Sequence, residues 1–178
     1  MKQLHLILVL AFAHCGSVYA QSTPVAVLSD IPTQESKNAW KSKEQETREK
    51  LNKVCSNESY KLFFAKTTCN VGELTLQHLT DDSKATPAEK KVLLLVDTEY
   101  LTIAQMAADN YKLNIKPESL GTALSNMRMK GRSDSQENLT NLYQGKITWG
   151  AYNTQRKAIA TFGKAEFDRI VKDPSLQR

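Results

Sequence analysis

The sequence predicts an all-α protein of about five helices, with a long central helix over residues 87–113 and a helical hairpin at the C-terminal end. Two observations lead to this prediction. Beyond residue 36, apolar residues recur mostly at the three- and four-residue spacing of a helix face. Several segments with this spacing also begin at residues that cap helices well and end at glycine or proline.

Residues 1–20 have the order of a cleavable secretory signal peptide. Lys2 supplies a positive charge, an almost wholly apolar run follows over 4–13, and Val18 and Ala20 stand at positions −3 and −1 of the expected cut. The apolar run is about half as long as the roughly 20 residues of a membrane-spanning helix. We therefore expect a periplasmic or secreted protein with no transmembrane segment in the mature chain. The alternative is an N-terminal helix that is retained in the core or as an anchor.

The remaining chain has the length of one domain. Residues 21–35 contain Pro24 and Pro32 and show no sustained periodicity, which predicts a poorly ordered lead-in. Residues 36–178 are predicted to form a single helical domain.

The charge of the chain is mildly basic and well mixed. The net charge is +5, and it falls to +4 when Lys2 leaves with the signal. In the helix predicted over 36–54, acids precede bases by four residues, the order that stabilises a helix surface: Glu44 with Arg48, Glu46 with Lys50, and Glu49 with Lys53. A nucleic-acid-binding face would not alternate in this way, so we expect no nucleic acid partner. Binding of an anionic ligand by the basic surface stays open as a third hypothesis.

Cysteine and histidine usage limits the chemistry of the mature chain. Cys55 and Cys69 are its two cysteines, and an even pair in an exported chain predicts a disulfide worth roughly 3 kcal/mol by loop entropy. His78 is its one histidine, so a multi-histidine metal centre is excluded. No cofactor motif is present. We expect neither a metal nor a cofactor, and we interpret His78 as a partly exposed surface residue.

The first helix is predicted over 36–54 with a narrow buried stripe that includes Trp40, Leu51 and Val54. The apolar segment 59–66 is too short for periodicity to separate a helix from a strand.

The central helix has the clearest start signal. Thr86 is a good N-cap, Pro87 suits the first helical position, and Glu89 completes a capping box. The run 92–96 is apolar on all sides, so we expect this turn to be buried on several sides. The alternative for 92–96 is a buried strand, which the capping box and the long helical continuation disfavour.

The next segment is predicted as two helices. The first spans 118–130 with Gly131 as its C-terminal stop. Ser133 followed by Gln136 offers a capping box for a second, short helix that ends near Gln144. Thr148 then caps the last helix, with Ile147 and Tyr152 at the hydrophobic-staple positions.

Over 139–160, a leucine-bearing helix, a Gly-x-Ile-Thr turn and an aromatic-bearing helix follow one another. The residues of this pattern are Leu139, Leu142, Gly145, Ile147, Thr148 and Tyr152. The pattern resembles the short C-terminal bacterial hairpin called SHOCT, and the resemblance implies a role in oligomerisation or location. It covers about 22 of 178 residues and departs from the family at Gly150 and Ala151, where the family favours acids.

Three aromatic residues within ten positions, Tyr143, Trp149 and Tyr152, suggest a contact centre for a protein partner, for self-association or for glycans. The alternative is that Trp149 and Tyr152 pack the core of the hairpin. The sequence therefore favours a non-enzymatic protein-interaction or self-association module of the bacterial envelope.

The alternative function is a peptidoglycan-acting glycosidase centred on Glu118. The fragment 117–119 superficially resembles the Glu-Ser start of muramidase catalytic helices. The downstream Gly-Ala-x-Gly-Leu-Met-Gln segment of those enzymes is absent, and an acid in the first turn of a helix is favoured by the helix dipole alone. We assign no catalytic residue, and the sequence leans against an enzyme.

Overall fold

The computed structural model describes residues 34–178, which form an all-α fold without strands. The predicted signal peptide 1–20 and all but the last two residues of the predicted lead-in lie outside the described residues. The α-helices are α2 (Gln34–Cys55), α3 (Lys61–Phe64), α4 (Leu76–Leu79), α5 (Pro87–Asn114), α6 (Glu118–Tyr143) and α7 (Trp149–Val171). Short 3₁₀ turns lie at η1 (Glu58–Tyr60), η2 (Val71–Glu73) and η3 (Pro174–Leu176).

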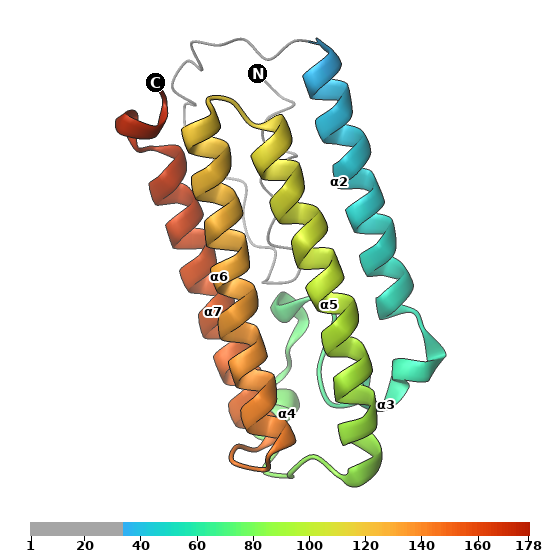
Figure 1. Ribbon diagram of the computed structural model, residues 1–178. Helices are drawn as coiled ribbons and strands as arrows, with labels where there is room; N and C mark the ends of the chain where they lie inside the picture. Colours follow the sequence, from blue (N-terminus) through green and yellow to red (C-terminus); the bar gives the residue numbers. More distant parts are fainter. Residues whose placement is uncertain (1–33) are drawn as a thin grey trace.

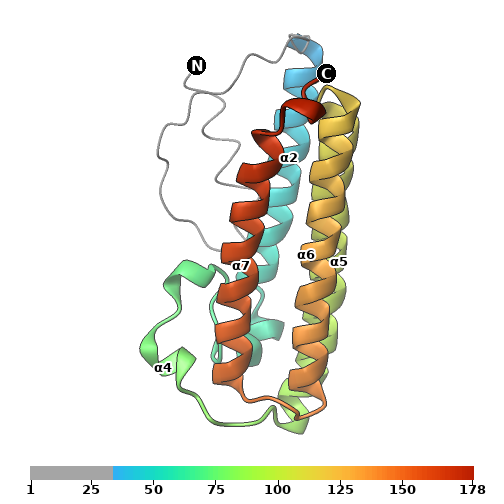
Figure 2. The same ribbon diagram turned by 90° about the vertical axis from the view of Figure 1, so that its left-hand side faces the viewer.

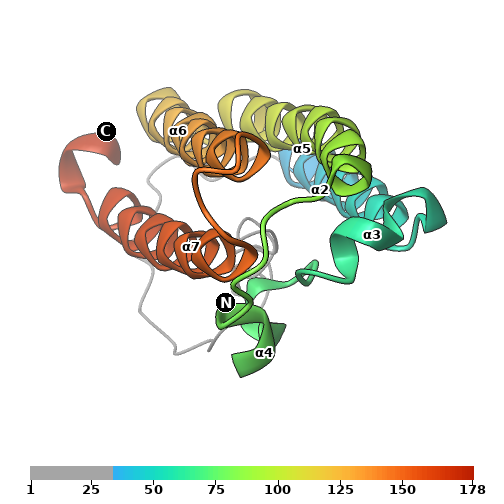
Figure 3. The same ribbon diagram turned by 90° about the horizontal axis from the view of Figure 1, so that it is seen from below.

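The four long helices form an antiparallel bundle in which each one runs opposite to the long helix before it (Figure 1). α5 packs against α2 on one side and α6 on the other, and α6 packs against α7. The connections α5–α6 and α6–α7 are short, whereas residues 56–86 make an excursion at one end of the bundle that contains α3 and α4 (Figures 2 and 3). The segment 59–66, left open between helix and strand, contains the end of η1 and the short helix α3, and no strand.

The central helix α5 confirms the prediction over 87–113. The Thr86 hydroxyl accepts a hydrogen bond from the backbone N–H of Glu89 at 3.3 Å, and the Glu89 carboxylate accepts one from the backbone N–H of Thr86 at 2.7 Å. The expectation for 92–96 holds only in part. Leu93 is fully buried, but Leu94 and Leu95 are 53% and 54% exposed because neighbouring long helices cover α5 on two sides only.

α6 corrects the prediction of two helices. It runs without interruption from Glu118 to Tyr143, so Gly131 lies inside it and is not its stop. The predicted capping box at Ser133 and Gln136 therefore has no helix start to cap. The backbone carbonyl of Gly131 accepts a hydrogen bond from Ser135 Oγ at 2.8 Å, four residues further along the same helix. The low helix propensity of glycine predicted a break at Gly131. In the structure, the packing of the surrounding helix outweighs this low propensity.

The C-terminal hairpin forms as predicted. Gly145 has a φ of +72°, a left-handed conformation that glycine adopts without strain. It lies in the turn that follows the end of α6. The Thr148 hydroxyl accepts from the backbone N–H of Ala151 at 3.2 Å and caps α7. Ile147 and Tyr152 pack into the same apolar cluster, as the hydrophobic staple requires.

The interior contains two apolar clusters at opposite ends of the bundle. The larger cluster joins α2, α5, the end of α6 and the start of α7 with the 56–86 excursion, and it includes Leu51, Phe63, Leu93, Val96, Ile103, Leu142, Trp149 and Tyr152. The smaller cluster is made by Trp40, Tyr111, Leu120, Leu124, Phe167 and Ile170. The bundle is thus apolar at each end, and polar side chains lie between the two clusters.

The disulfide predicted from the cysteine count is present. Cys55 at the end of α2 and Cys69 in the following loop are bonded, with their Cα atoms 5.8 Å apart. The bond fastens the middle of the 56–86 excursion to the end of α2.

Candidate functional site

The three aromatic residues proposed as a contact centre do not share one surface. Trp149 is fully buried and Tyr152 is 3% exposed, and both belong to the larger apolar cluster with their rings 5.6 Å apart. Tyr143 alone lies at the surface, where the Lys90 ammonium sits 5.5 Å from its ring centroid. The packing alternative therefore describes Trp149 and Tyr152, and these two side chains offer no surface to a partner in this structure.

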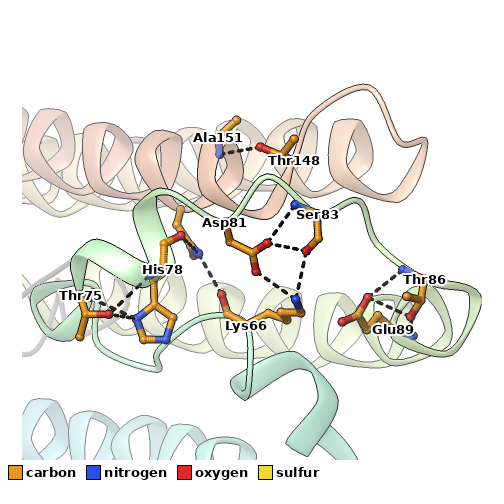
Figure 4. A network of polar contacts seen from close by, with 10 residues as sticks. Lys66, Thr75, His78, Asp81, Ser83, Thr86, Glu89, Thr148 and Ala151 are labelled. Atoms are coloured by element: carbon orange, nitrogen blue, oxygen red, sulfur yellow. Dashed lines mark hydrogen bonds and ion pairs between the residues drawn. The ribbon is translucent and has the colours of Figure 1, made fainter.

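A polar network fixes the loop between α4 and α5 beside the first turn of α7 (Figure 4). The Asp81 carboxylate accepts from the backbone N–H of Ser83 at 2.9 Å and from its hydroxyl at 2.5 Å, and it pairs with the Lys66 ammonium at 3.0 Å. The same ammonium donates to Ser83 Oγ at 3.0 Å. Because Lys66 is held as the cation of an ion pair, it is not placed to act as a base for the Ser83 hydroxyl. We interpret this network as a structural clamp.

Backbone contacts complete the clamp. The backbone N–H of Gly150 donates to the Asp81 carbonyl at 2.7 Å, and that of Trp149 donates to the Ser83 carbonyl at 3.0 Å. A Cβ atom on Gly150 would lie 2.6 Å from the Leu79 carbonyl oxygen, so the loop leaves no room for a side chain there. This close approach explains why position 150 is a glycine.

The ionisation of Asp81 reflects the same contacts. Partial burial raises the pKa of its carboxyl, but the hydrogen bonds from Ser83 and Lys66 and the charge of Lys66 outweigh burial. The net result is a pKa below the ordinary value, which favours the charged carboxylate.

His78 and Glu118 lie in separate, largely structural positions. The His78 ring accepts from the backbone N–H of Thr75 at 3.1 Å and forms the capping box of the short helix α4, while its backbone carbonyl accepts from Asn153 Nδ2 (Figure 4). Glu118 is exposed in the first turn of α6. Within residues 34–178, no group of three or more metal-ligating side chains comes together, and no helix is long and apolar enough to cross a membrane.

An interior pocket opens between the two apolar clusters. Its volume is about 60 Å³. It is lined by side chains of α5, α6 and α7: Asp97, Tyr100, Ala104, Arg128, Arg132, Ser135, Leu139, Tyr152 and Arg156. We call it the arginine pocket, because three of the nine residues that line it are arginines.

The arginines of this pocket are held in place by contacts to different elements. Arg132 is 7% exposed, and its Nη2 pairs with the Asp97 carboxylate at 2.5 Å, which joins α6 to α5. Arg156 is 8% exposed and donates to the Thr67 hydroxyl and, at 3.0 Å, to the Thr68 carbonyl, which joins α7 to the loop that carries Cys69. Two of the three arginines are therefore positioned by contacts to other elements.

The two tyrosines of the pocket are kept protonated. Burial raises the pKa of the Tyr100 hydroxyl strongly, although the nearby charge of Arg156 lowers it in part. Burial also raises the pKa of Tyr152, and Arg156 again opposes the shift. Both hydroxyls remain neutral at physiological pH and can donate hydrogen bonds.

The outward side of α5 carries an uncharged stripe. Leu94, Leu95 and Leu101 are 53%, 54% and 45% exposed, and Thr98 and Thr102 lie exposed among them. Each threonine hydroxyl donates to the backbone carbonyl four residues before it at 3.1 Å, so the methyl groups are left to face outward. We call these five residues the α5 leucine face.

Comparison with protein-family models, with curated proteins and with solved structures found no match to this chain. The resemblance of 139–160 to the SHOCT hairpin therefore stays a prediction.

Neither the arginine pocket nor the α5 leucine face is among the predictions from the sequence, although the sequence carries a signal for each. Leu94 and Leu101 stand one heptad apart with Thr98 between them, a spacing that places them on one helix face. Arg128 and Arg132 continue the four-residue series of Leu120 and Leu124 along the inner side of α6. That series is visible only when the helix passes through residue 131.

Proposed function

We propose that this protein is an exported helical bundle that acts through protein contact and not through catalysis, and that it self-associates through the α5 leucine face. The observation that carries the proposal is a run of three half-exposed leucines on one uncharged helix face. Contiguous apolar surface of this kind is typical of protein contact sites. Export is supported by the residue order of 1–20 and by the disulfide, which is common in oxidising compartments.

A second copy of the chain is the partner that the face fits best. Two α5 helices that pack antiparallel about Thr98 would place Leu95 of each copy opposite Leu101 of the other and Leu94 one position away, so the same patch serves both. No ionised side chain lies within the α5 leucine face, so this pairing buries no unpaired charge at its centre. The same arrangement brings Lys91 of one copy to within about one helical turn of Asp109 of the other. These two side chains carry opposite charges and lie at the edges of the contact.

The test is the solution mass of the processed protein over a hundredfold range of concentration. The full chain is expressed for export and purified, and its intact mass also checks cleavage after Ala20. We expect the solution mass to rise from one chain toward two. The variant carrying Leu94→Glu and Leu101→Glu should dissociate at least tenfold more readily, because it would bury like charges side by side.

Leu76→Glu is the matched control. Leu76 is 75% exposed on α4, which lies on the other side of α7 from α5 (Figure 2). This variant should associate as the wild type does, and all variants should keep the same helical circular dichroism. A wild type with the mass of a single chain at every concentration, or a Leu94 and Leu101 variant that associates normally, would contradict the proposal.

Trp149→Ala is unsuitable as a probe of self-association, because Trp149 is fully buried and its substitution would report the stability of the core.

A further inference from the structure

One buried arginine in the lining of the arginine pocket has no carboxylate partner among the described residues. Arg132 is paired with Asp97, the one acidic residue that lines the pocket, whereas Arg156 is not. A buried charge is costly unless an opposite charge or several hydrogen bonds compensate it. The interior therefore favours the arrival of an anion.

Arg156 gives the clearest evidence for a missing negative charge. It is 8% exposed, and the contacts that the described residues make to its guanidinium are all neutral: the Thr67 hydroxyl, the Thr68 carbonyl and the ring of Tyr152, whose centroid lies 5.8 Å away. No carboxylate of residues 34–178 forms an ion pair with it. In addition, the Nε of Arg132 is buried and has no hydrogen-bond partner among the described side chains.

We propose that the arginine pocket binds a small oxyanion: phosphate, sulfate or the carboxylate of a small organic acid. These ligands share two or more oxygens that accept parallel hydrogen bonds from a guanidinium group, a geometry that arginine presents better than any other side chain. Tyr100 and Tyr152, whose hydroxyls stay protonated, also line the pocket.

The size of the pocket limits which small oxyanions can bind in it. A volume of about 60 Å³ holds about four waters at roughly 15 Å³ each, and so a ligand of four or five non-hydrogen atoms. Tyr100, Arg128 and Ser135 are only half-buried, so the pocket is not sealed from solvent. Ala104 and Leu139 form an apolar part of the lining, which distinguishes this pocket from an exposed cluster of lysines or arginines.

The experiment measures binding of phosphate, sulfate and acetate to the processed protein by calorimetry, with the ionic strength held constant by sodium chloride. A parallel thermal scan follows the unfolding midpoint. We expect at least one oxyanion to bind saturably with one site per chain and to raise the midpoint, whereas chloride alone does not. The oxyanion that binds most tightly distinguishes a tetrahedral ligand from a carboxylate.

Two variants test the location of the site. Arg156→Gln should weaken binding at least tenfold by removing a charge-assisted hydrogen bond. Ala104→Leu keeps every charge and fills the cavity, so it should also weaken binding at least tenfold, and it keeps the proposal falsifiable if Arg156→Gln does not fold. Arg169→Gln, on the exposed side of α7, is the charge-matched control and should bind within about twofold of the wild type.

Absence of saturable binding below about 10 mM for all three oxyanions would overturn the proposal. So would an Ala104→Leu variant that is folded and binds as the wild type does, because the ligand would then be held at the surface. Weakening by Arg169→Gln equal to that by Arg156→Gln would point to general attraction by net charge and would also reject a site in the pocket.

Discussion

Asp81 and Ser83 hold the loop between α4 and α5 through a small number of polar contacts. The Asp81 carboxylate takes hydrogen bonds from Ser83 and the ion pair of Lys66, and the Asp81 carbonyl receives the Gly150 N–H. Asn153, fully buried on α7, adds hydrogen bonds from its Nδ2 to the carbonyls of Lys66 and His78 at 2.9 and 3.0 Å. Single side chains therefore decide how the excursion 56–86 is attached to the bundle.

Asp81→Asn should lower the free energy of unfolding at pH 7 by about 1–2 kcal/mol, because the charge-assisted contacts to Lys66 and Ser83 are lost. The pKa of Asp81 is lowered in the folded state, so its contribution is present above the ordinary carboxyl pKa of about 3.9 and is lost as the pH falls through the lower folded value. The wild type should therefore lose stability below about pH 4 more steeply than the variant. Urea unfolding between pH 7 and pH 3 measures both effects.

Asp82→Asn provides the control for this prediction. Asp82 is the exposed neighbour of Asp81, and its substitution removes the same charge from the same loop. It should change the stability by less than about 0.5 kcal/mol. Equal effects of the two substitutions would mean that the clamp contributes nothing beyond the net charge.

At the scale of elements, the continuity of α6 decides whether the arginine pocket exists. Arg128 lies before Gly131 and Arg132 after it, and only an unbroken helix stacks the two on one inner face. Arg132 then reaches Asp97 on α5. The interior polar layer is thus a consequence of a helix that runs through a glycine.

Local signals predicted most of the elements. The capping box at Thr86 fixed the start of α5, and Gly145 with Thr148 fixed the hairpin, because these are bonds between residues three or four positions apart. Gly131 misled because its cost inside a helix is only about 1 kcal/mol, less than the packing of the surrounding turns provides. The side of α5 that stays exposed depends on how many helices pack around it. This number cannot be read from a local sequence pattern.

Gly131→Ala should raise the free energy of unfolding by roughly 0.5–1 kcal/mol. The added Cβ meets nothing within 4 Å, and alanine lowers the backbone entropy of the unfolded chain. Chemical denaturation of the two proteins measures the difference. Gly150→Ala, also in a helix, should act in the opposite direction because its Cβ would lie 2.6 Å from a backbone oxygen. A destabilising Gly131→Ala would indicate that α6 does break at this position.

For the whole molecule, the division into two apolar clusters and a polar middle sets how the helices register against one another. Apolar contacts tolerate sliding by a turn, but an ion pair inside the bundle fits one register only. Three polar contacts join neighbouring helices at defined positions: Asp97 with Arg132 between α5 and α6, Lys50 with Glu99 at 2.8 Å between α2 and α5, and the Asn110 amide with the Trp40 carbonyl at 3.2 Å. The sequence shows these residues but not their pairing, because their partners are 35 to 70 positions away.

The Asp97–Arg132 pair allows a test of this role by a double-mutant cycle. Asp97→Leu alone should cost roughly 3 kcal/mol, because it leaves Arg132, which is 7% exposed, as a buried cation without its carboxylate. Arg132→Met alone should cost less, since Asp97 is half-buried and regains water. The double variant should recover most of the loss, because two apolar side chains can pack where the ion pair stood. If the pair sets the register, the recovered stability should come with a less cooperative unfolding transition and broader amide resonances of α5 and α6. A double variant that is both as stable and as cooperative as the wild type would assign the register to the apolar clusters alone.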